Sequence, residues 1–252
     1  MTILYFTSTG NCLMAARKIG GEKGKLLSIP VLMRKEQLQI QDNAIGLVFP
    51  VYGLSVPPII LEFIQKAKLK AEYLFAVLTY GTYDAGTAHQ FLEETAKHKM
   101  NFQYVNTLHM QENYLPGFAM EKQKTPSNQA KKLEQIRTDI ENRKVSLKQN
   151  SGFDRFMTRT HQKSYHYNRG VGVTGQYQID GNCQKCGICG QICPTKNIKI
   201  ENEKVVFGAD CLSCLSCIQN CPQKAIHLVK EKSAVRYRNP EISLADILEA
   251  NS

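Results

Sequence analysis

Eight of the nine cysteines lie between positions 183 and 221 and form a tandem repeat. The first copy reads Cys183-x2-Cys186-x2-Cys189-x3-Cys193-Pro194, and the second, 28 residues later, reads Cys211-x2-Cys214-x2-Cys217-x3-Cys221-Pro222. Gln191 and Gln219 also match, so the repeat extends beyond the cysteines. Neither copy alone is large enough for a hydrophobic core, and we therefore expect the two copies to fold as one unit.

This spacing is the bacterial pattern for ligation of 4Fe-4S clusters, in which the fourth cysteine binds the cluster of the other motif. It predicts one cluster on Cys183, Cys186, Cys189 and Cys221, and a second on Cys211, Cys214, Cys217 and Cys193. A pair of zinc sites is the alternative, since four thiolates also suit tetrahedral zinc, although zinc sites usually pair two separated Cys-x2-Cys units. Residues 175 to 230 resemble bacterial two-cluster ferredoxins.

The rest of the composition predicts a cytoplasmic protein. The N-terminus lacks the basic region and long apolar stretch of a secretory signal. Residues 43–61 are uncharged, but Pro50, Gly53, Pro57 and Pro58 interrupt any membrane-spanning helix. Clustered cysteines in a reducing compartment hold metal more often than they form disulfides.

The formal net charge of +10 raises the question of nucleic acid. Two four-thiolate clusters would add about −4 and a bound phosphate group about −2, leaving roughly +4. Much of the excess basic charge therefore balances bound groups. An acidic redox partner is the next explanation of the positive charge, and nucleic acid comes third. We therefore expect no nucleic acid among the partners.

The first half of the chain alternates short apolar runs with stretches of helical periodicity, which predicts a doubly wound parallel sheet. The expected strands are Ile3–Phe6, Lys25–Ile29, Ala44–Phe49, Tyr73–Thr79 and Phe102–Met110. The expected helices follow residue 12, cover Pro58–Lys66 and Ala88–Lys97, and include a last one capped by Thr125 or Ser127, with Leu133, Ile136 and Ile140 on one face.

Three segments at the ends of these strands are the candidate binding loops, because ligands of such sheets bind at the carboxyl ends of the strands. They are Thr7-Ser8-Thr9-Gly10-Asn11-Cys12, Pro50-Val51-Tyr52-Gly53 and Tyr80-Gly81-Thr82-Tyr83. The first precedes a helix and suits a phosphate group. The other two, with Phe49, supply aromatic rings for stacking.

Residues 1–148 resemble flavodoxin, whose phosphate loop reads Thr/Ser-x-Thr-Gly-Asn-Thr/Ser. The resemblance implies FMN at the three loops and a role for Gly53 in a peptide that rotates beside the flavin. Cys12 departs from the pattern and is a weaker hydrogen-bond donor than a hydroxyl, which puts the strength of phosphate binding in doubt. The whole chain resembles the family of flavodoxin-ferredoxin fusion proteins of anaerobes.

The expected architecture is an α/β flavodoxin-like domain with a five-stranded, doubly wound parallel sheet, followed by an α+β dicluster ferredoxin-like domain. The expected boundaries are a flavodoxin-like domain at 1–148, a linker at 149–172, a ferredoxin domain at 173–230 and a tail with a short helix, begun by Asn239 and Pro240, at 231–252. The linker reads as an interdomain connector, and a basic docking patch is its alternative.

The leading interpretation of function is electron transfer between FMN and the two clusters, with unidentified redox proteins as donor and acceptor. An FMN-dependent reductase of a quinone or flavin, fed by the clusters, is the alternative. An interaction protein with structural clusters is a third possibility. The sequence does not decide whether the chain is an enzyme or an electron carrier.

Overall fold

A computed structural model describes residues 1–164 and 176–252. These residues form two compact units. Among the described residues, unit 1 contains 1–7, 12–111 and 125–164. Unit 2 contains 8–11, 112–124 and 176–252. The part of the expected linker from 165 to 172 lies outside the described residues.

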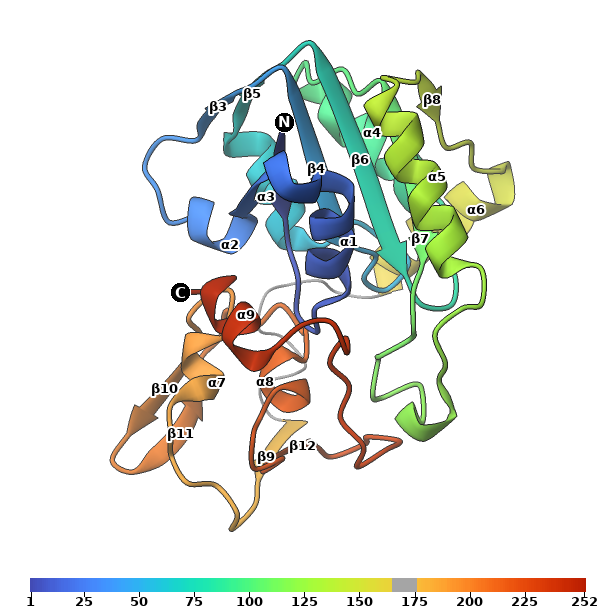
Figure 1. Cartoon of the computed structure of the whole chain (residues 1–252). Helices are drawn as coiled ribbons and strands as arrows, with labels where there is room; N and C mark the ends of the chain where they lie inside the picture. Colours follow the sequence, from blue (N-terminus) through green and yellow to red (C-terminus); the bar gives the residue numbers. More distant parts are fainter. Residues whose placement is uncertain (165–175) are drawn as a thin grey trace. The chain divides into compact units, whose positions relative to one another are not determined.

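Unit 1 is built on one parallel sheet (Figure 1). Its strands are β1 (Thr2–Tyr5), β2 (Lys25–Ser28), β4 (Ala44–Pro50), β6 (Tyr73–Tyr80), β7 (Tyr104–His109) and β8 (Ser146–Leu147), in the order β2-β1-β4-β6-β7-β8. Without β8, the five long strands run 2-1-3-4-5 by chain order, which is the flavodoxin-like arrangement. The predicted fold class is therefore confirmed, and the two-residue β8 is an additional edge strand.

Helices lie on both faces of this sheet, with α1 and α5 on the near face in Figure 1 and α3 and α4 behind it. Their bounds are α1 (Asn11–Gly20), α3 (Pro58–Lys66), α4 (Thr87–Lys97) and α5 (Gln129–Glu141). The expected cap of α5 is wrong. The Gln129 N–H first donates to the Pro126 carbonyl in a turn, and Asn128 occupies the N-cap position.

Several short elements of unit 1 have no clear sequence signal. They are η1 (Gly21–Lys23), α2 (Ile29–Leu32) and a small parallel sheet of β3 (Gln39–Gln41) and β5 (Lys68–Lys70). Two- to four-residue elements offer too little periodicity to be recognised.

The expected linker contains a regular helix, α6 (Gly152–Ser164), which belongs to unit 1. Its Thr158 hydroxyl accepts from the Gly86 N–H at 2.8 Å and donates to the Leu54 carbonyl at 2.8 Å. Regular structure thus continues beyond residue 148. Little in the residue pattern indicates this helix, because buried polar contacts, more than an apolar stripe, hold it in place.

Unit 2 contains two short antiparallel pairs and two one-turn helices. The pairs are β9 (Tyr177–Ile179) with β12 (Ile226–Leu228), and β10 (Ile198–Glu201) with β11 (Lys204–Phe207); the helices are α7 (Ile188–Gln191) and α8 (Ser216–Gln219). A further turn, η2 (Met120–Lys122), supplies Met120 to the core. That core also holds Ile198, Leu215, Ile218 and Ile226.

The two cysteine motifs have the same backbone geometry, which confirms the internal repeat. Left-handed residues occur at three matched pairs of positions, Lys185 and Ser213, Gly187 and Leu215, and Lys196 and Lys224. The hydrogen bonds also match, since the N–H groups of Lys196 and Lys224 donate to the carbonyls of Cys193 and Cys221, both at 3.0 Å.

The C-terminal helix is α9 (Leu244–Glu249), which begins later than Asn239 and Pro240 predict. Ser243 is its N-cap and forms a capping box with Asp246, a stronger helix start than a proline alone. Like the other helices of the described chain, α9 lacks the length and apolar character that crossing a membrane requires.

Candidate iron-sulfur and flavin sites

Two cavities in the described part of unit 2 are each lined by four cysteines. Cys183, Cys186, Cys189 and Cys221 line the first, and Cys193, Cys211, Cys214 and Cys217 line the second. The first has a volume of about 350 Å³ and the second about 330 Å³, both including their open mouths. Each cavity therefore combines three cysteines of one motif with the last cysteine of the other, the grouping that the spacing predicts.

The one-turn helices produce this exchange. Cys189 is the second residue of α7 and Cys217 the second residue of α8, so the helical turn faces the local cavity. The chain then leaves the helix, and the last cysteine of each motif lines the other cavity. Proline follows that cysteine in both motifs and prevents the helix from continuing.

The first cavity is the more exposed of the two. Cys186 is exposed, and the lining also includes Gln184, Lys185 and Gln223. The Lys185 ammonium forms an ion pair with the Glu203 carboxylate at 3.0 Å. The pKa of the Cys189 thiol is raised to about 11, chiefly by burial and to a smaller extent by the neighbouring thiols Cys186 and Cys221.

The second cavity is more buried and more aromatic. Tyr177 and Phe207 line it and stack on each other with ring centroids 4.4 Å apart. Cys217 is only 7% exposed. Burial raises the pKa of Cys217 and of Cys214, and nearby thiols, including Cys193 of the other motif, add to the effect.

Backbone and hydroxyl donors surround the sulfurs of the second cavity. The Ser213 N–H donates to Cys211 Sγ and the Asn197 N–H donates to Cys193 Sγ, both at 3.3 Å. The Tyr177 hydroxyl lies 3.4 Å from Cys211 Sγ. Burial, followed by the neighbouring thiols, raises the pKa of Tyr177, so its hydroxyl stays protonated and can donate. Such hydrogen bonds stabilise thiolates that carry metal.

The cysteine sets fit four-iron clusters. None of the nine cysteines is in a disulfide, and in the described part of the chain no three His, Cys, Asp or Glu side chains stand close enough to hold a single metal ion. Four cysteine sulfurs around a cavity can each bind one iron of a cubane cluster, which is larger than a single metal ion. The fourfold set also supplies the thiolates that each such cluster requires.

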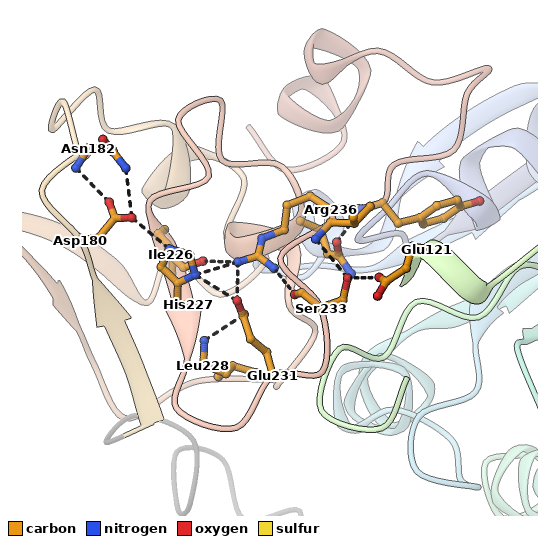
Figure 2. Close-up of polar contacts among 12 residues, drawn as sticks. Glu121, Asp180, Asn182, Ile226, His227, Leu228, Glu231, Ser233 and Arg236 are labelled. Atoms are coloured by element: carbon orange, nitrogen blue, oxygen red, sulfur yellow. Dashed lines mark hydrogen bonds and ion pairs between the residues drawn. The ribbon is translucent and has the colours of Figure 1, made fainter. Parts of the chain in front are cut away.

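A polar network supports the part of unit 2 beside the first cavity (Figure 2). The two ring nitrogens of His227 lie 3.0 Å from Glu231 and 3.1 Å from Asp180. The carbonyl of Asp180 in turn accepts from the Cys183 N–H at 3.3 Å. The network therefore connects β12 with the start of the first cysteine motif.

The protonation of His227 follows from these partners. The hydrogen bond to Glu231 raises the His227 pKa, and that to Asp180 adds to the effect against the opposing burial. The Arg236 guanidinium also lies 3.0 Å from His227 Nδ1, but a protonated Nδ1 cannot accept. We therefore assign the Arg236 donors to Glu231, at 2.9 Å, and to the Ile226 carbonyl, at 3.2 Å.

The three predicted flavin loops follow β1, β4 and β6, which are neighbours in the sheet of unit 1. Thr7, Cys12, Pro50–Gly53 and Tyr80–Tyr83 belong to unit 1, whereas Ser8–Asn11 belong to unit 2. The strand order reverses at β1, between β2 and β4, and this kind of switch point is where doubly wound folds bind ligands.

The aromatic side chains of these loops differ in what they contact. Tyr52 is partly exposed, in a turn where Gly53 has φ +50°. The Tyr80 ring stacks on His109 with centroids 5.0 Å apart, and the Tyr83 hydroxyl bonds to Asp154. Phe49 is fully buried against Phe91, so the expectation that it stacks on a ligand is wrong. Its side chain faces the helices that cover the sheet.

The Cys12 side chain packs inside unit 1 and is not presented on the surface of the loop. Its Sγ lies 3.1 Å from the Thr79 hydroxyl in a buried contact, and burial raises the pKa of the thiol to about 12. The thiol is therefore neutral and directed at β6. Any hydrogen bonds from this loop to a phosphate must come from its other groups.

Several residues around these sites were not predicted from the sequence. Tyr177, Phe207 and Asn197 line the second cavity, and His227 and Arg236 support the first. Asn197 lies in the first motif, where the matched position of the second holds Ala225, and this break in the repeat is a signal that could have been used. The others come together only through tertiary pairing.

Comparison with known proteins agrees with the C-terminal assignment. Residues 130–240 match the family model described as a 4Fe-4S dicluster domain. That stretch of the chain therefore contains a 4Fe-4S dicluster domain, and the prediction of two clusters is confirmed. No curated protein sequence matches the chain.

Solved structures similar to the chain include two bacterial proteins. Trp repressor binding protein from Bacillus subtilis has 12% identity and a TM-score of 0.39 over 57% of this chain and 99% of its own. Two-electron reduced flavodoxin from Megasphaera elsdenii has 15% identity and a TM-score of 0.36 over 55% of this chain and 98% of its own. The assignment of the flavodoxin-like fold rests on the strand order alone.

Proposed function

We propose that this chain is an iron-sulfur flavoprotein that transfers electrons between FMN and two 4Fe-4S clusters. The observation that carries the proposal is the pair of four-cysteine cavities in a chain that also has a flavodoxin-like sheet with three ligand-type loops. Redox proteins that remain to be identified would act as donor and acceptor in the reducing interior of the cell.

The proposed ligands follow the two cavities. Cys183, Cys186, Cys189 and Cys221 would hold one cluster, and Cys193, Cys211, Cys214 and Cys217 the other. The raised thiol pKa values support this role, because binding to iron replaces protons that several crowded thiols could not all lose on their own.

The proposed flavin contacts are the three loops at the carboxyl edge of the sheet. Thr7–Cys12 would hold the phosphate, while Pro50–Gly53 and Tyr80–Tyr83 would flank the ring system. Tyr52 is the better candidate for stacking, because the Tyr80 ring already stacks on His109 and the Tyr83 hydroxyl is bonded to Asp154. Gly53, with φ +50°, lies in a turn whose peptide can change orientation at low cost.

The chemistry of the two groups explains why one chain would carry both. FMN exchanges one or two electrons and a 4Fe-4S cluster exchanges one, so their combination connects two-electron and one-electron partners. The chain itself holds the thiolates, supplies the N–H donors that tune them and limits water around the second cavity.

The alternative function is an FMN-dependent reductase of a small quinone or flavin, fed by the clusters. The partly exposed Tyr52 and exposed Tyr83 favour it, because they leave room for a small molecule at the sheet edge. The two functions differ in what the reduced protein reacts with.

The experiment is to reduce the anaerobically purified full chain chemically and to mix it with ferredoxin- or flavodoxin-type acceptors and, separately, with quinones and free flavin. If the chain is an electron carrier, the protein acceptors oxidise its reduced form rapidly and the small molecules oxidise it slowly. Fast turnover of quinone or flavin selects the reductase, and failure to react with either class contradicts both.

A further inference from the structure

The middle of the predicted phosphate loop, Ser8–Asn11, belongs to unit 2. Ser8–Asn11 contact at least six other residues of that unit. One is Asn113, whose side-chain amide donates to Thr9 Oγ1 at 2.8 Å. We call the other five the loop clamp: Ser216, Asn220, Tyr237, Asn239 and Ile242.

The C-terminal tail is anchored at Arg236, just before the residues that contact the loop. Arg236 is almost fully buried and is anchored to Glu231, to the Ile226 carbonyl and to the Ser233 carbonyl (Figure 2). The Ser233 hydroxyl donates to Glu121 at 2.5 Å. The tail that follows Arg236 is therefore held in place before it reaches the loop.

Three tail residues then contact the loop directly. The Tyr237 hydroxyl donates to Asn11 Oδ1 at 2.8 Å, and Asn239 Nδ2 donates to the same oxygen at 3.0 Å. Burial raises the pKa of Tyr237 to about 12, so this hydroxyl remains a donor near neutral pH. Gly10 has φ +95°, and a Cβ there would lie 2.8 Å from the Cβ of Ile242. Only glycine permits this close approach.

Helix α8 holds the loop at a second point. The Ser216 hydroxyl and the Asn220 amide both donate to the Ser8 carbonyl, at 3.1 and 2.9 Å. Ser216 directly precedes Cys217, which lines the second cavity. The backbone N–H of Asn239 also donates to the Thr9 carbonyl at 2.8 Å.

These contacts determine which way the loop's peptides face. In a planar trans peptide the C=O and the N–H point in opposite directions, and the described chain has no cis peptide bond. Because the carbonyls of Ser8 and Thr9 point at the clamp, the N–H groups of Thr9 and Gly10 point away from it. N–H groups aligned before a helix are the donors that a phosphate requires.

We propose that the loop clamp is a positioning device for flavin binding, which orients the Thr9 and Gly10 N–H groups toward the FMN phosphate. This inference rests on the proposed function. It assigns to residues of unit 2 the orientation of the loop's N–H groups. The clamp side chains are uncharged, so they orient the loop without adding charge to it.

The test compares FMN with riboflavin, which lacks the phosphate, on the anaerobically purified full chain with its clusters present. Binding is followed by the quenching of flavin fluorescence. Tyr237→Phe and Ser216→Ala each remove one donor, and we expect each to weaken FMN binding roughly three- to tenfold, the effect of one hydrogen bond. Riboflavin affinity should change less than about twofold, since the clamp acts only through the phosphate loop.

Ser243→Ala is the matched control, because it removes the cap of α9 in the same tail without removing a contact to the loop. It should leave the ratio of FMN to riboflavin affinity unchanged. Equal weakening of both flavins by Tyr237→Phe, or no weakening of either, would overturn the clamp. If the unaltered chain binds riboflavin and FMN equally, the clamp fails while flavin binding stands. If it binds neither, the proposed function fails as well.

Discussion

The two cysteine motifs share one backbone but occupy different environments. Their left-handed residues and turn hydrogen bonds coincide position by position. Yet α8 is fully buried, whereas α7 is partly exposed, and the second cavity is lined by Tyr177 and Phe207 where the first has Gln184 and Lys185. The repeat thus fixes the geometry of the ligands, while the side chains around them set the surroundings of each cluster.

This difference should give the two clusters different reduction potentials. Solvent exposure and hydrogen bonds to sulfur are two of the main factors that set the potential of a cluster. The first cavity, with Cys186 exposed, is the more accessible to an external partner. The second is enclosed by the core of unit 2 and by the contacts that α8 makes with Ser8. Four predictions test this comparison, in order of decreasing effect.

The largest expected effect is the loss of iron when the cysteine that one motif supplies to the other cavity is replaced. Cys221→Ala should remove the cluster of the first cavity and about half of the iron, although Cys221 belongs to the second motif. Iron and sulfide analysis of double variants then identifies the partner. Adding Cys183→Ala should cost no further iron, whereas adding Cys211→Ala should remove nearly all of it. The opposite pattern would mean that each motif binds its own cluster.

The matched positions Gly187 and Leu215 test the difference in packing. Leu215 is 5% exposed in the core, so Leu215→Ala should lower the free energy of unfolding by about 2–5 kcal/mol. Gly187→Ala adds a Cβ that makes only ordinary van der Waals contacts, with Gln191 and Ile200, and strains the left-handed backbone, which costs about 1–2 kcal/mol. Anaerobic denaturant titration followed by cluster absorbance measures both. A larger loss for Gly187→Ala would contradict the comparison.

The hydroxyl of Tyr177 should tune only the second cluster. It lies 3.4 Å from Cys211 Sγ, and donation to a sulfur stabilises the more negative, reduced state. Tyr177→Phe should therefore lower that potential by roughly 40 mV, which corresponds to a hydrogen bond of about 1 kcal/mol for one electron. Redox titration followed by electron paramagnetic resonance measures it. A shift in the first cluster alone would argue against the assignment.

His227 should have the smallest effect, and on the side of the first cavity. Its pKa in the folded chain lies above the ordinary value, so the stability it contributes is fully present below about pH 6.5 and is lost as the pH rises through the raised value. The difference in melting temperature between the parent and His227→Gln should therefore be larger at pH 6 than at pH 8. A constant difference would mean that the charge of His227 does not matter.

Local spacing explains what could be predicted from the sequence. The cysteine sets follow from a short repeated pattern, and α3 has the predicted bounds because Pro58 begins it and a periodic apolar face continues to Lys66. The parallel strands were visible for the same reason, as apolar runs between helices. Each of these signals lies within about ten residues of chain.

Contacts between distant segments explain what was missed. The Thr158 hydroxyl fixes α6 to residues 72 positions or more away, and Tyr237 reaches Asn11 across 226 positions. Single serine, threonine or asparagine side chains that make such contacts look like ordinary surface residues in the sequence. The expected role of Phe49 failed for a related reason, since its ring packs on Phe91 of α4, a residue far along the chain.

The content of iron, acid-labile sulfide, zinc and flavin in the full chain, purified without oxygen, tests the central claim most directly. Two four-iron clusters and one flavin predict about eight iron, about eight sulfide and about one FMN per chain. Two zinc ions per chain without sulfide would contradict the account.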